Sequence, residues 1–170
     1  MIDGAKLNSP EPITNIHNTG EFNCGIEALN DYLQKYALQN HLNGSARTYV
    51  ASKEQNIVGY YSLAYGSVAY SEATKRVTHG LAKHPIPVIL LARLAVDITQ
   101  QNKGLGKGLL KDALLRTVQA AEIGGLRAVL VHAKDQAAKT FYQKYGFEAS
   151  PIDPLHLFLL MNDLRKTLGI

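Results

Sequence analysis

TQQNKGLGKGLL, residues 99–110, is the stretch from which the fold of this chain can be deduced. The apolar run VILLARLAVD (88–97) precedes it and has the composition of a strand that is buried on both faces. Apolar residues at helical spacing follow it, starting at Leu109. Glycines at alternating positions and two lysines stand between strand and helix: Gly104, Gly106, Gly108, Lys103 and Lys107.

A strand, a glycine turn and the start of a helix together form an anion site. The first N–H groups of a helix have no intrahelical acceptor, and the helix dipole favours negative charge at that end. We expect Gly104 and Gly106 to adopt positive φ angles and to let the backbone approach the anion closely. The flanking lysines add positive charge. The stretch therefore predicts a phosphate-binding turn.

Two common nucleotide motifs fit this turn poorly. A P-loop requires Ser or Thr after its Gly-Lys pair, but Gly108 follows Lys107, and Gln101 stands where the first glycine belongs. A dinucleotide-binding fingerprint requires its third glycine one residue later and an acid at the end of the next strand. The next strand here ends at His132. The ligand is therefore expected to be a different phosphate compound.

The rest of the pattern predicts one domain over residues 1–170 with an α/β (α+β) architecture, a mixed central β-sheet flanked by helices. Its centre is a right-handed parallel strand–helix–strand unit. Residues 1–22 read as irregular with one short strand, and 71–84 as a loop with one helical turn. The other expected elements are helices at 25–42 (as one or two pieces), 109–121 and 137–145, and strands at 47–52, 57–65, 88–97, 127–132 and 155–161, the first two forming a hairpin.

Composition indicates a globular protein that lies in the cytoplasm and not in a membrane. Hydrophobic residues make up 46% of the 170 residues and charged residues 19%. The apolar run 88–92 has five residues, whereas a membrane-spanning helix needs about 20, and the N-terminus lacks the apolar core of a signal peptide. The single cysteine, Cys24, and six histidines without ligand spacing predict no metal site.

Positive charge is concentrated in one part of the chain. The formal net charge is +4, and residues 73–96 contain no acid. The basic side chains of this segment are Lys75, Arg76, His79, Lys83, His84 and Arg93. Such a segment attracts a polyanionic partner or forms a solvated loop, and both interpretations stay open.

Residues 101–106, with the pattern Q-x-x-G-x-G, resemble the GNAT acyltransferase superfamily. LARLAVD (91–97) resembles its splayed central strand, and AKTFYQKYGFE (138–148) its closing motif. The resemblance implies a GNAT fold with acetyl-CoA as acetyl donor, its pyrophosphate held by the turn and its pantetheine arm paired with the strand. The residues that it implies for acetyl-CoA binding are Leu94, Ala95, Val96, Gln101, Asn102, Lys103, Gly104, Leu105, Gly106, Lys107 and Gly108.

Four segments narrow the resemblance to the bacterial toxin branch of this superfamily: ARTYVA (46–51), GYYSLAYGSV (59–68), PIPVILLARLAVD (85–97) and FYQKYGF (141–147). These toxins acetylate the amino group of aminoacyl-tRNA and so block translation. The resemblance implies an antitoxin partner with a ribbon-helix-helix DNA-binding end, and a homodimer.

Tyr142 is the expected catalytic residue, because the resemblance places the matching tyrosine near the cofactor sulfur. A phenol, with an ordinary pKa of about 10, can protonate a thiolate as it leaves. Tyr145 is the rival candidate for this role, and the alternative interpretation of Tyr142 is an aromatic residue that serves only in packing. The family also implies that backbone N–H groups near Leu94 to Val96 stabilise the oxyanion. Asp97 is expected to be a cap or turn residue.

No strong general base is evident in the sequence, and this bears on the acceptor. A lysine amine has a pKa of about 10.4, whereas an α-amino group has one of about 7.7–8.0 and is partly neutral without help. An aminoacyl ester therefore suits the site better than a lysine side chain. Candidate tRNA-binding residues are Lys35, Arg47, Arg76, Lys83 and Arg93.

Arg93 stands inside an apolar run, so it needs a partner or an open cleft, and a structural ion pair is the alternative to a role in tRNA binding. Two other functions stay open: acetylation of a protein N-terminus or a small amine, and a non-catalytic acyl-CoA- or RNA-binding module. The sequence does not specify which aminoacyl-tRNA would be preferred.

Overall fold

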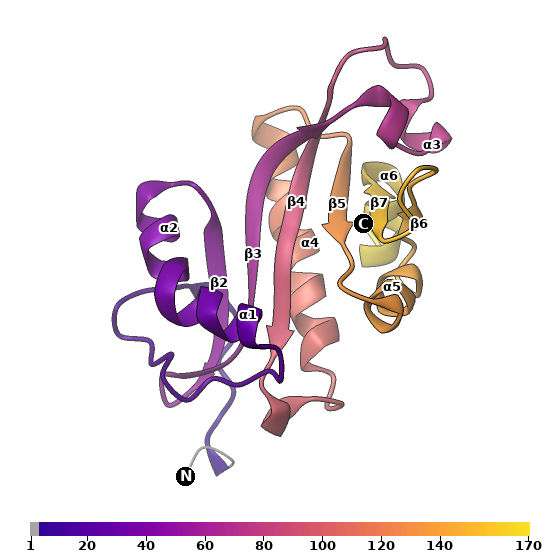
Figure 1. Cartoon of the computed structure of the whole chain (residues 1–170). Helices are drawn as coiled ribbons and strands as arrows, with labels where there is room; N and C mark the ends of the chain where they lie inside the picture. The colour runs from indigo at the N-terminus through magenta and orange to yellow at the C-terminus, as the bar shows by residue number, and fades with distance from the viewer. Residues whose placement is uncertain (1–3) are drawn as a thin grey trace. The chain divides into compact units, whose positions relative to one another are not determined.

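The computed structural model describes residues 4–170 (Figure 1). The strands of these residues form a seven-stranded sheet in the order β1-β2-β3-β4-β5-β7-β6. Their bounds are β1 Glu11–Pro12, β2 Arg47–Lys53, β3 Asn56–Val68, β4 Ile86–Val96, β5 Ala128–His132, β6 Glu148–Ala149 and β7 His156–Leu160. The predicted mixed sheet is confirmed, because β4 and β5 pair in parallel while β2–β3, β5–β7 and β6–β7 pair antiparallel.

Besides α-helices, the described residues contain the π-helical segment η2 and the 3₁₀ segments η3 and η4. Their bounds are α1 Glu27–Asp31, η2 (π) Tyr32–Tyr36, α2 Ala37–Asn43, η3 (3₁₀) Tyr70–Glu72, α3 Lys75–Thr78, η4 (3₁₀) Ile98–Gln100, α4 Leu105–Ile123, α5 Gln136–Gln143 and α6 Met161–Leu168. Within residues 4–170, no helix is both long and apolar enough to cross a lipid bilayer.

The chain divides into two compact units. The first unit comprises the residues up to Ala64 together with Ala92–Ala113, and the second unit comprises Tyr65–Leu91 and Leu114–Ile170. Strands β3 and β4 and helix α4 each begin in one unit and end in the other. The expectation of a single domain over residues 1–170 stays a prediction.

The predicted hairpin in the first unit is confirmed. Its register runs from Arg47 opposite Leu63 to Lys53 opposite Asn56, with one irregularity at Ala51. Glu54 and Gln55 form the turn and both have positive φ angles, 50° and 67°. Two-residue turns of this kind match the twist of the strands that they join.

The predicted helical segment at 25–42 is confirmed in outline, as three consecutive pieces from Glu27 to Asn43. The middle piece, η2, is π-helical, so the apolar periodicity shifts by one residue there. Leu33 and Ala37 are fully buried and pack with Val50 and Tyr60 of the hairpin. The core of the first unit is therefore formed by this helical segment on the hairpin.

In the second unit, β4 and β5 pair from Val88 opposite Ala128 to Leu91 opposite Val131. The Arg127 guanidinium, just before β5, donates hydrogen bonds to the carbonyls of Arg76, Val77 and His79 and so holds α3. The core of this unit includes Val68, Val77, Ile86, Leu130 and Phe158.

Two elements of the second unit were absent from the sequence-based prediction. Strand β6 has two residues and pairs Glu148 with Phe158. Helix α6 begins at Met161, the residue expected to end a strand. The helix is mostly polar, and its buried residues are Met161 and Leu164. Met161 therefore belongs both to the apolar pattern of the preceding strand and to the first turn of the helix. Its Asp163 accepts from Arg76 of α3, which also contacts Glu148.

Helix α4 lies very close to β3 in the first unit, at Gly59. A Cβ atom added to Gly59 would lie 2.9 Å from Cδ1 of Leu109 and 3.1 Å from Cδ2 of Leu105. Real Cβ atoms almost never come this close to another heavy atom, so a side chain here must push Leu105 and Leu109 away. The absence of a side chain at Gly59 therefore sets how closely α4 approaches the sheet.

We predict that Gly59→Ala lowers the free energy of unfolding by about 1–3 kcal/mol, because it overpacks the contact between β3 and α4. Gly66→Ala on the same strand is the matched control, since its Cβ would meet only Val88 Cγ2, at 3.9 Å. Gly66→Ala should be neutral or slightly stabilising. Urea unfolding of both variants measures the difference, and equal effects would contradict the prediction.

Candidate functional site

The glycine turn joins η4 to α4 in the first unit. Asn102 and Gly104 have positive φ angles, 63° and 87°, and α4 begins at Leu105. Gly104 thus has the predicted conformation. The expectation for Gly106 is wrong, because this residue already lies in the first turn of the helix. Asn102 takes the second left-handed position instead, as asparagine does more readily than most residues.

The start of α4 presents backbone N–H groups that the hydrogen bonding of the helix itself does not use. Gly108 N–H donates to the Gly104 carbonyl at 3.1 Å, closing the first helical turn. The N–H groups of Leu105, Gly106 and Lys107 come before this bond and have no intrahelical acceptor. Lys103 and Lys107 are exposed beside them. These features suit an anion, which supports the predicted phosphate-binding turn.

Gln101 is tied to the backbone of the first unit by its side chain. Its Nε2 atom donates to the Val96 carbonyl at 2.9 Å and to the Cys24 carbonyl at 3.0 Å. The side-chain amide nitrogen therefore anchors the turn to the end of β4. A contact of Gln101 with acetyl-CoA would therefore use the side-chain oxygen or the backbone of Gln101.

Asp97 directly follows β4 and is a buried residue that caps η4, as expected. Its Oδ1 atom accepts from Asn23 N–H at 2.9 Å, and its Oδ2 atom accepts from the N–H and hydroxyl of Thr99 at 3.0 and 2.7 Å. Both carboxylate oxygens are therefore engaged in structure. Asp97 N–H donates to the Val58 carbonyl at 2.8 Å, which joins β4 to β3 next to Gly59.

The end of β4, residues 94–96, contains the strand backbone that was expected to hold the pantetheine arm. Ala95 is buried, whereas Leu94 and Val96 are half-buried. The parallel pairing of β4 with β5 within the second unit ends before this point, at Leu91. The assignment of oxyanion donors to residues 94–96 stays a prediction.

Tyr142 lies in α5 of the second unit. The helix is capped by Asp135, whose carboxylate accepts from Ala138 N–H at 2.8 Å. The Tyr142 ring makes edge contacts with Phe141 and Phe147 and is 8% exposed. Burial raises the pKa of the Tyr142 phenol above its ordinary value. The phenol is thus protonated at neutral pH.

The surroundings of Tyr142 differ from those of its rival Tyr145. Within residues 4–170, the Tyr142 hydroxyl makes no hydrogen bond, so its proton is not committed to a protein acceptor. Tyr145 is half-buried, packs on Phe141 and accepts from the Thr167 hydroxyl at its backbone carbonyl. These contacts make Tyr142 the better placed proton donor of the two, but its role stays a prediction.

Three candidate tRNA-binding residues lie in the first unit. Lys35 forms an ion pair with Asp31 at 3.5 Å, and exposed Arg47 donates to the His41 carbonyl at 2.8 Å. Arg93 is half-buried, and its Cζ atom lies 3.6 Å from the centroid of the Tyr32 ring. The partner of Arg93 is therefore an aromatic ring, where an ion pair had been the structural alternative.

The other two candidates lie in the second unit. Arg76 contacts two carboxylates, Glu148 and Asp163, which hold α3, β6 and α6 together. Hydrogen bonding to Arg76 lowers the pKa of the Asp163 carboxyl below its ordinary value. Lys83 is exposed in the loop after α3. The positive charge of Arg76 is thus offset locally, whereas that of Lys83 is open to solvent.

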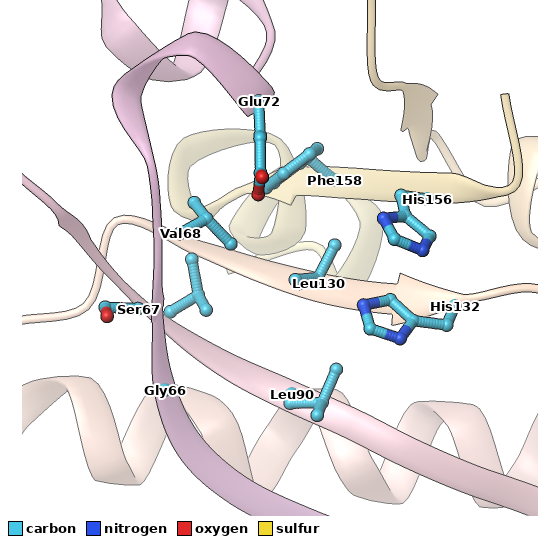
Figure 2. A pocket seen from close by; sticks show the side chains of 10 residues that line it. Gly66, Ser67, Val68, Glu72, Leu90, Leu130, His132, His156 and Phe158 are labelled. Atoms are coloured by element: carbon cyan, nitrogen blue, oxygen red, sulfur yellow. The ribbon is translucent and has the colours of Figure 1, made fainter. Parts of the chain in front are cut away.

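The second unit also contains a pocket that the sequence analysis missed (Figure 2). Its volume is about 240 Å³. The pocket floor is apolar and crosses four strands: Val68, Val88, Leu90, Leu130 and Phe158. Glu72 lies at one side of the pocket and His132 and His156 at another. A pocket of this size suits a single amino-acid side chain better than a larger ligand.

His132 and His156 are cross-strand neighbours on β5 and β7. Their rings stack at a centroid distance of 3.9 Å and an angle of 14°. Asp153 lies 3.3 Å from Nε2 of His156. Burial, and then repulsion from His156, lower the pKa of His132 below its ordinary value. Within residues 4–170, no cluster of three or more His, Cys, Asp or Glu side chains is arranged to hold a metal ion.

Known proteins resemble the chain over almost its whole length. A family model described as an acetyltransferase (GNAT) domain matches residues 44–149. The tRNA-acetylating toxin of Mycobacterium tuberculosis (strain ATCC 25618 / H37Rv) is 48% identical over 161 residues, which cover 95% of this chain and 96% of the relative.

Two solved structures share the fold at similar identity. AtaT complexed with acetyl-methionyl-tRNAfMet has a TM-score of 0.88 at 26% identity, covering 96% of this chain and 99% of AtaT. A mutant AtaT toxin bound to the C-terminus of the antitoxin AtaR and acetyl-CoA has a TM-score of 0.81 at 26% identity, covering 97% of this chain and 99% of that toxin.

The matched segment 44–149 contains β4, the glycine turn and Tyr142, the parts that carry the three motifs. The mixed sheet with its parallel β4–β5 pair agrees with the expected fold. Motifs, fold and family model thus agree, and the chain belongs to the GNAT family of acetyltransferases.

Proposed function

We propose that this acetyltransferase is a bacterial toxin that transfers the acetyl group of acetyl-CoA to the α-amino group of aminoacyl-tRNA and so blocks translation. The observation that carries the proposal is the 48% identity to a tRNA-acetylating toxin over 95% of the chain. A relationship of that extent includes both units and the segment between the glycine turn and Tyr142.

The backbone at the start of α4 supports acetyl-CoA as the donor. Unused N–H groups at Leu105, Gly106 and Lys107, the left-handed Gly104 and exposed Lys103 form a donor set that suits a pyrophosphate. Acetyl-CoA, when bound, supplies the acetyl group as a reactive thioester. The residues of the turn hold its phosphates, and the backbone of 94–96 is proposed to align its arm and to donate to the oxyanion.

Tyr142 is proposed to protonate the sulfur as the thiolate leaves. Its raised pKa keeps the phenol protonated, and its hydroxyl has no competing acceptor within residues 4–170. The side chain therefore has the protonation state that a general acid requires.

The acceptor chemistry favours an α-amino group. Asp97, the acid at the end of β4, uses both carboxylate oxygens in hydrogen bonds and is 7% exposed, so it is not available to deprotonate a lysine. An α-amino group is partly neutral at pH 7, since its ordinary pKa is about 7.7–8.0. The site therefore suits aminoacyl-tRNA better than a lysine side chain.

Arg93 is the strongest of the candidate tRNA-binding residues. The Tyr32 ring lies against the Arg93 guanidinium, and no carboxylate within residues 4–170 neutralises its charge. Its N–H edges can therefore donate to a phosphate of the tRNA. Lys83 and Arg47 are exposed and can add to the positive surface, whereas the charges of Lys35 and Arg76 are paired with acids.

An antitoxin is the proposed protein partner, by analogy with AtaR on AtaT. We expect it to carry a ribbon-helix-helix DNA-binding end and the toxin to form a homodimer, which would extend the basic surface. Because the target is aminoacyl-tRNA, the expected location is the cytoplasm.

Incubation of the protein with a set of charged tRNAs and radiolabelled acetyl-CoA tests the proposal. We expect label on the aminoacyl group of one or more tRNAs and none on deacylated tRNA. Label on a protein N-terminus or on a small amine, with none on any aminoacyl-tRNA, would identify another acceptor. Binding of acetyl-CoA without transfer to any acceptor would indicate a non-catalytic module.

Tyr142→Phe should lower kcat by about 100-fold or more, because it removes one proton donor. The Kd for acetyl-CoA should stay unchanged, since the ring and its packing remain. Tyr145→Phe, in the turn that follows the same helix, is the matched control and should keep kcat close to that of the wild type. The assignment is wrong if the loss follows Tyr145, or if Tyr142→Phe keeps full activity.

Arg93→Ala should raise the KM for aminoacyl-tRNA and leave the Kd for acetyl-CoA nearly unchanged. It should also reduce the slope of log affinity against log salt by about 1, as expected for one lost phosphate contact. Lys6→Ala, an exposed cation of the same unit, is the control and should change neither quantity. Equal loss of both affinities would assign Arg93 to structure instead.

A further inference from the structure

The pocket of the second unit contains a base that the sequence did not reveal. His132 is the last residue of β5, and the parallel pairing of β4 with β5 ends one residue earlier, at Leu91 opposite Val131. Ligands in sheets with parallel strands bind beyond the carboxyl ends of those strands. His132 therefore stands where the β4–β5 pairing stops, with its imidazole lining the pocket (Figure 2).

The groups facing His132 keep its imidazole available. His156 on β7 stacks on its ring, Asp153 contacts His156, and Glu72 of η3 lines another side of the pocket. Asp153 raises the pKa of His132, but burial and His156 together lower it by more. Within residues 4–170, the His132 side chain makes no hydrogen bond or ion pair. A neutral ring with an unused acceptor nitrogen is the result at neutral pH.

We propose that His132 accepts the proton that the acceptor amine loses during acetyl transfer, and that His156 positions the His132 ring by stacking on it. The apolar floor of the pocket, with Leu90, Leu130 and Phe158, would receive the side chain of the acceptor amino acid. This inference rests on the proposed function, because it takes the acceptor to be an α-amino group presented by aminoacyl-tRNA.

The proton and electron balance is complete. The amine lone pair forms the new C–N bond with the acetyl carbonyl carbon, and the nitrogen becomes positively charged. His132 takes one proton from this nitrogen and becomes imidazolium, while the C–S bond breaks and Tyr142 gives its proton to the sulfur. Solvent then removes the proton from His132 and returns one to Tyr142, so no further reactant is needed.

A weak base at this position also selects the class of acceptor. The nitrogen becomes strongly acidic once it has attacked, so neutral imidazole is basic enough to take its proton. The same imidazole cannot deprotonate a free lysine ammonium, whose pKa is about 10.4, but an α-amino group is already partly neutral. His132 therefore assists α-amino acceptors and gives little help to lysine side chains.

His132→Ala should lower kcat/KM for aminoacyl-tRNA by about 100-fold or more, the range expected for one general base. Added imidazole should restore part of the activity in proportion to its neutral fraction, and the same imidazole should not stimulate the wild-type protein. The Kd for acetyl-CoA and the thermal unfolding midpoint should stay unchanged. His132→Gln is the second variant, with similar polarity and no base at this pH.

Proton NMR titration of the acetyl-CoA-free protein gives a readout that does not depend on activity. His132 should titrate below its ordinary pKa, and His156→Phe should raise that pKa, since it removes the repelling charge and keeps a stacked ring. The acid limb of the kcat/KM profile should move to higher pH in this variant. If the pKa of the acceptor amine sets this acid limb instead, the limb should stay at the same pH in His156→Phe.

The outcomes separate the inference from the proposed function. Wild-type protein that acetylates aminoacyl-tRNA, with His132→Ala fully active or inactive but not rescued by imidazole, would overturn the role of His132 alone. A His132 that titrates above the assay pH would do the same. If the wild-type protein acetylates no aminoacyl-tRNA, the proposed acceptor is wrong, and both the proposed function and this inference are overturned.

Discussion

A buried carboxylate at the end of β4 fixes where helix α4 starts. Asp97 holds Thr99 of η4 and Asn23 of the N-terminal segment with its two oxygens, and its own N–H holds β3. Gln101 adds two bonds from the turn to the carbonyls of Val96 and Cys24. The free N–H groups of α4 thus have a fixed direction relative to the strand backbone at 94–96, which lies in the same unit. The proposed phosphate site at the turn and the proposed arm-binding backbone at 94–96 could be used together only under this constraint.

Much of the fold follows from local pattern, and the exceptions have identifiable physical causes. The strands at 47–53, 86–96 and 128–132 consist mostly of apolar or β-branched residues, and local sequence identifies such strands well. The first turn of α4 contains Gly106 and Gly108, poor helix formers, so the apolar pattern begins only at Leu109. Helix α6 is polar apart from Met161 and Leu164, and the preceding strand concealed its start.

The candidate site was predictable where a motif specifies backbone geometry, and unpredictable where distant residues meet. Gly104 has the expected left-handed conformation because the turn requires it, whereas Asn102 shares that role without a sequence signal. The stacking of His132 on His156 depends on the register of β5 against β7, which local periodicity does not determine. The same holds for Arg93, whose partner Tyr32 comes from a helix far away in the sequence.

The π-helical segment η2 limits which deletions the helical segment from Glu27 to Asn43 can tolerate. Tyr32 is its first residue, and the five-residue bonding pattern accommodates one residue more than an α-helix of the same rise. Deleting one residue after Tyr32 would regularise the helix, but each residue turns an α-helix by about 100°, so the ring or the buried Ala37 face would rotate away. The length of this segment, as much as its residue identities, therefore decides whether an aromatic ring lies against Arg93.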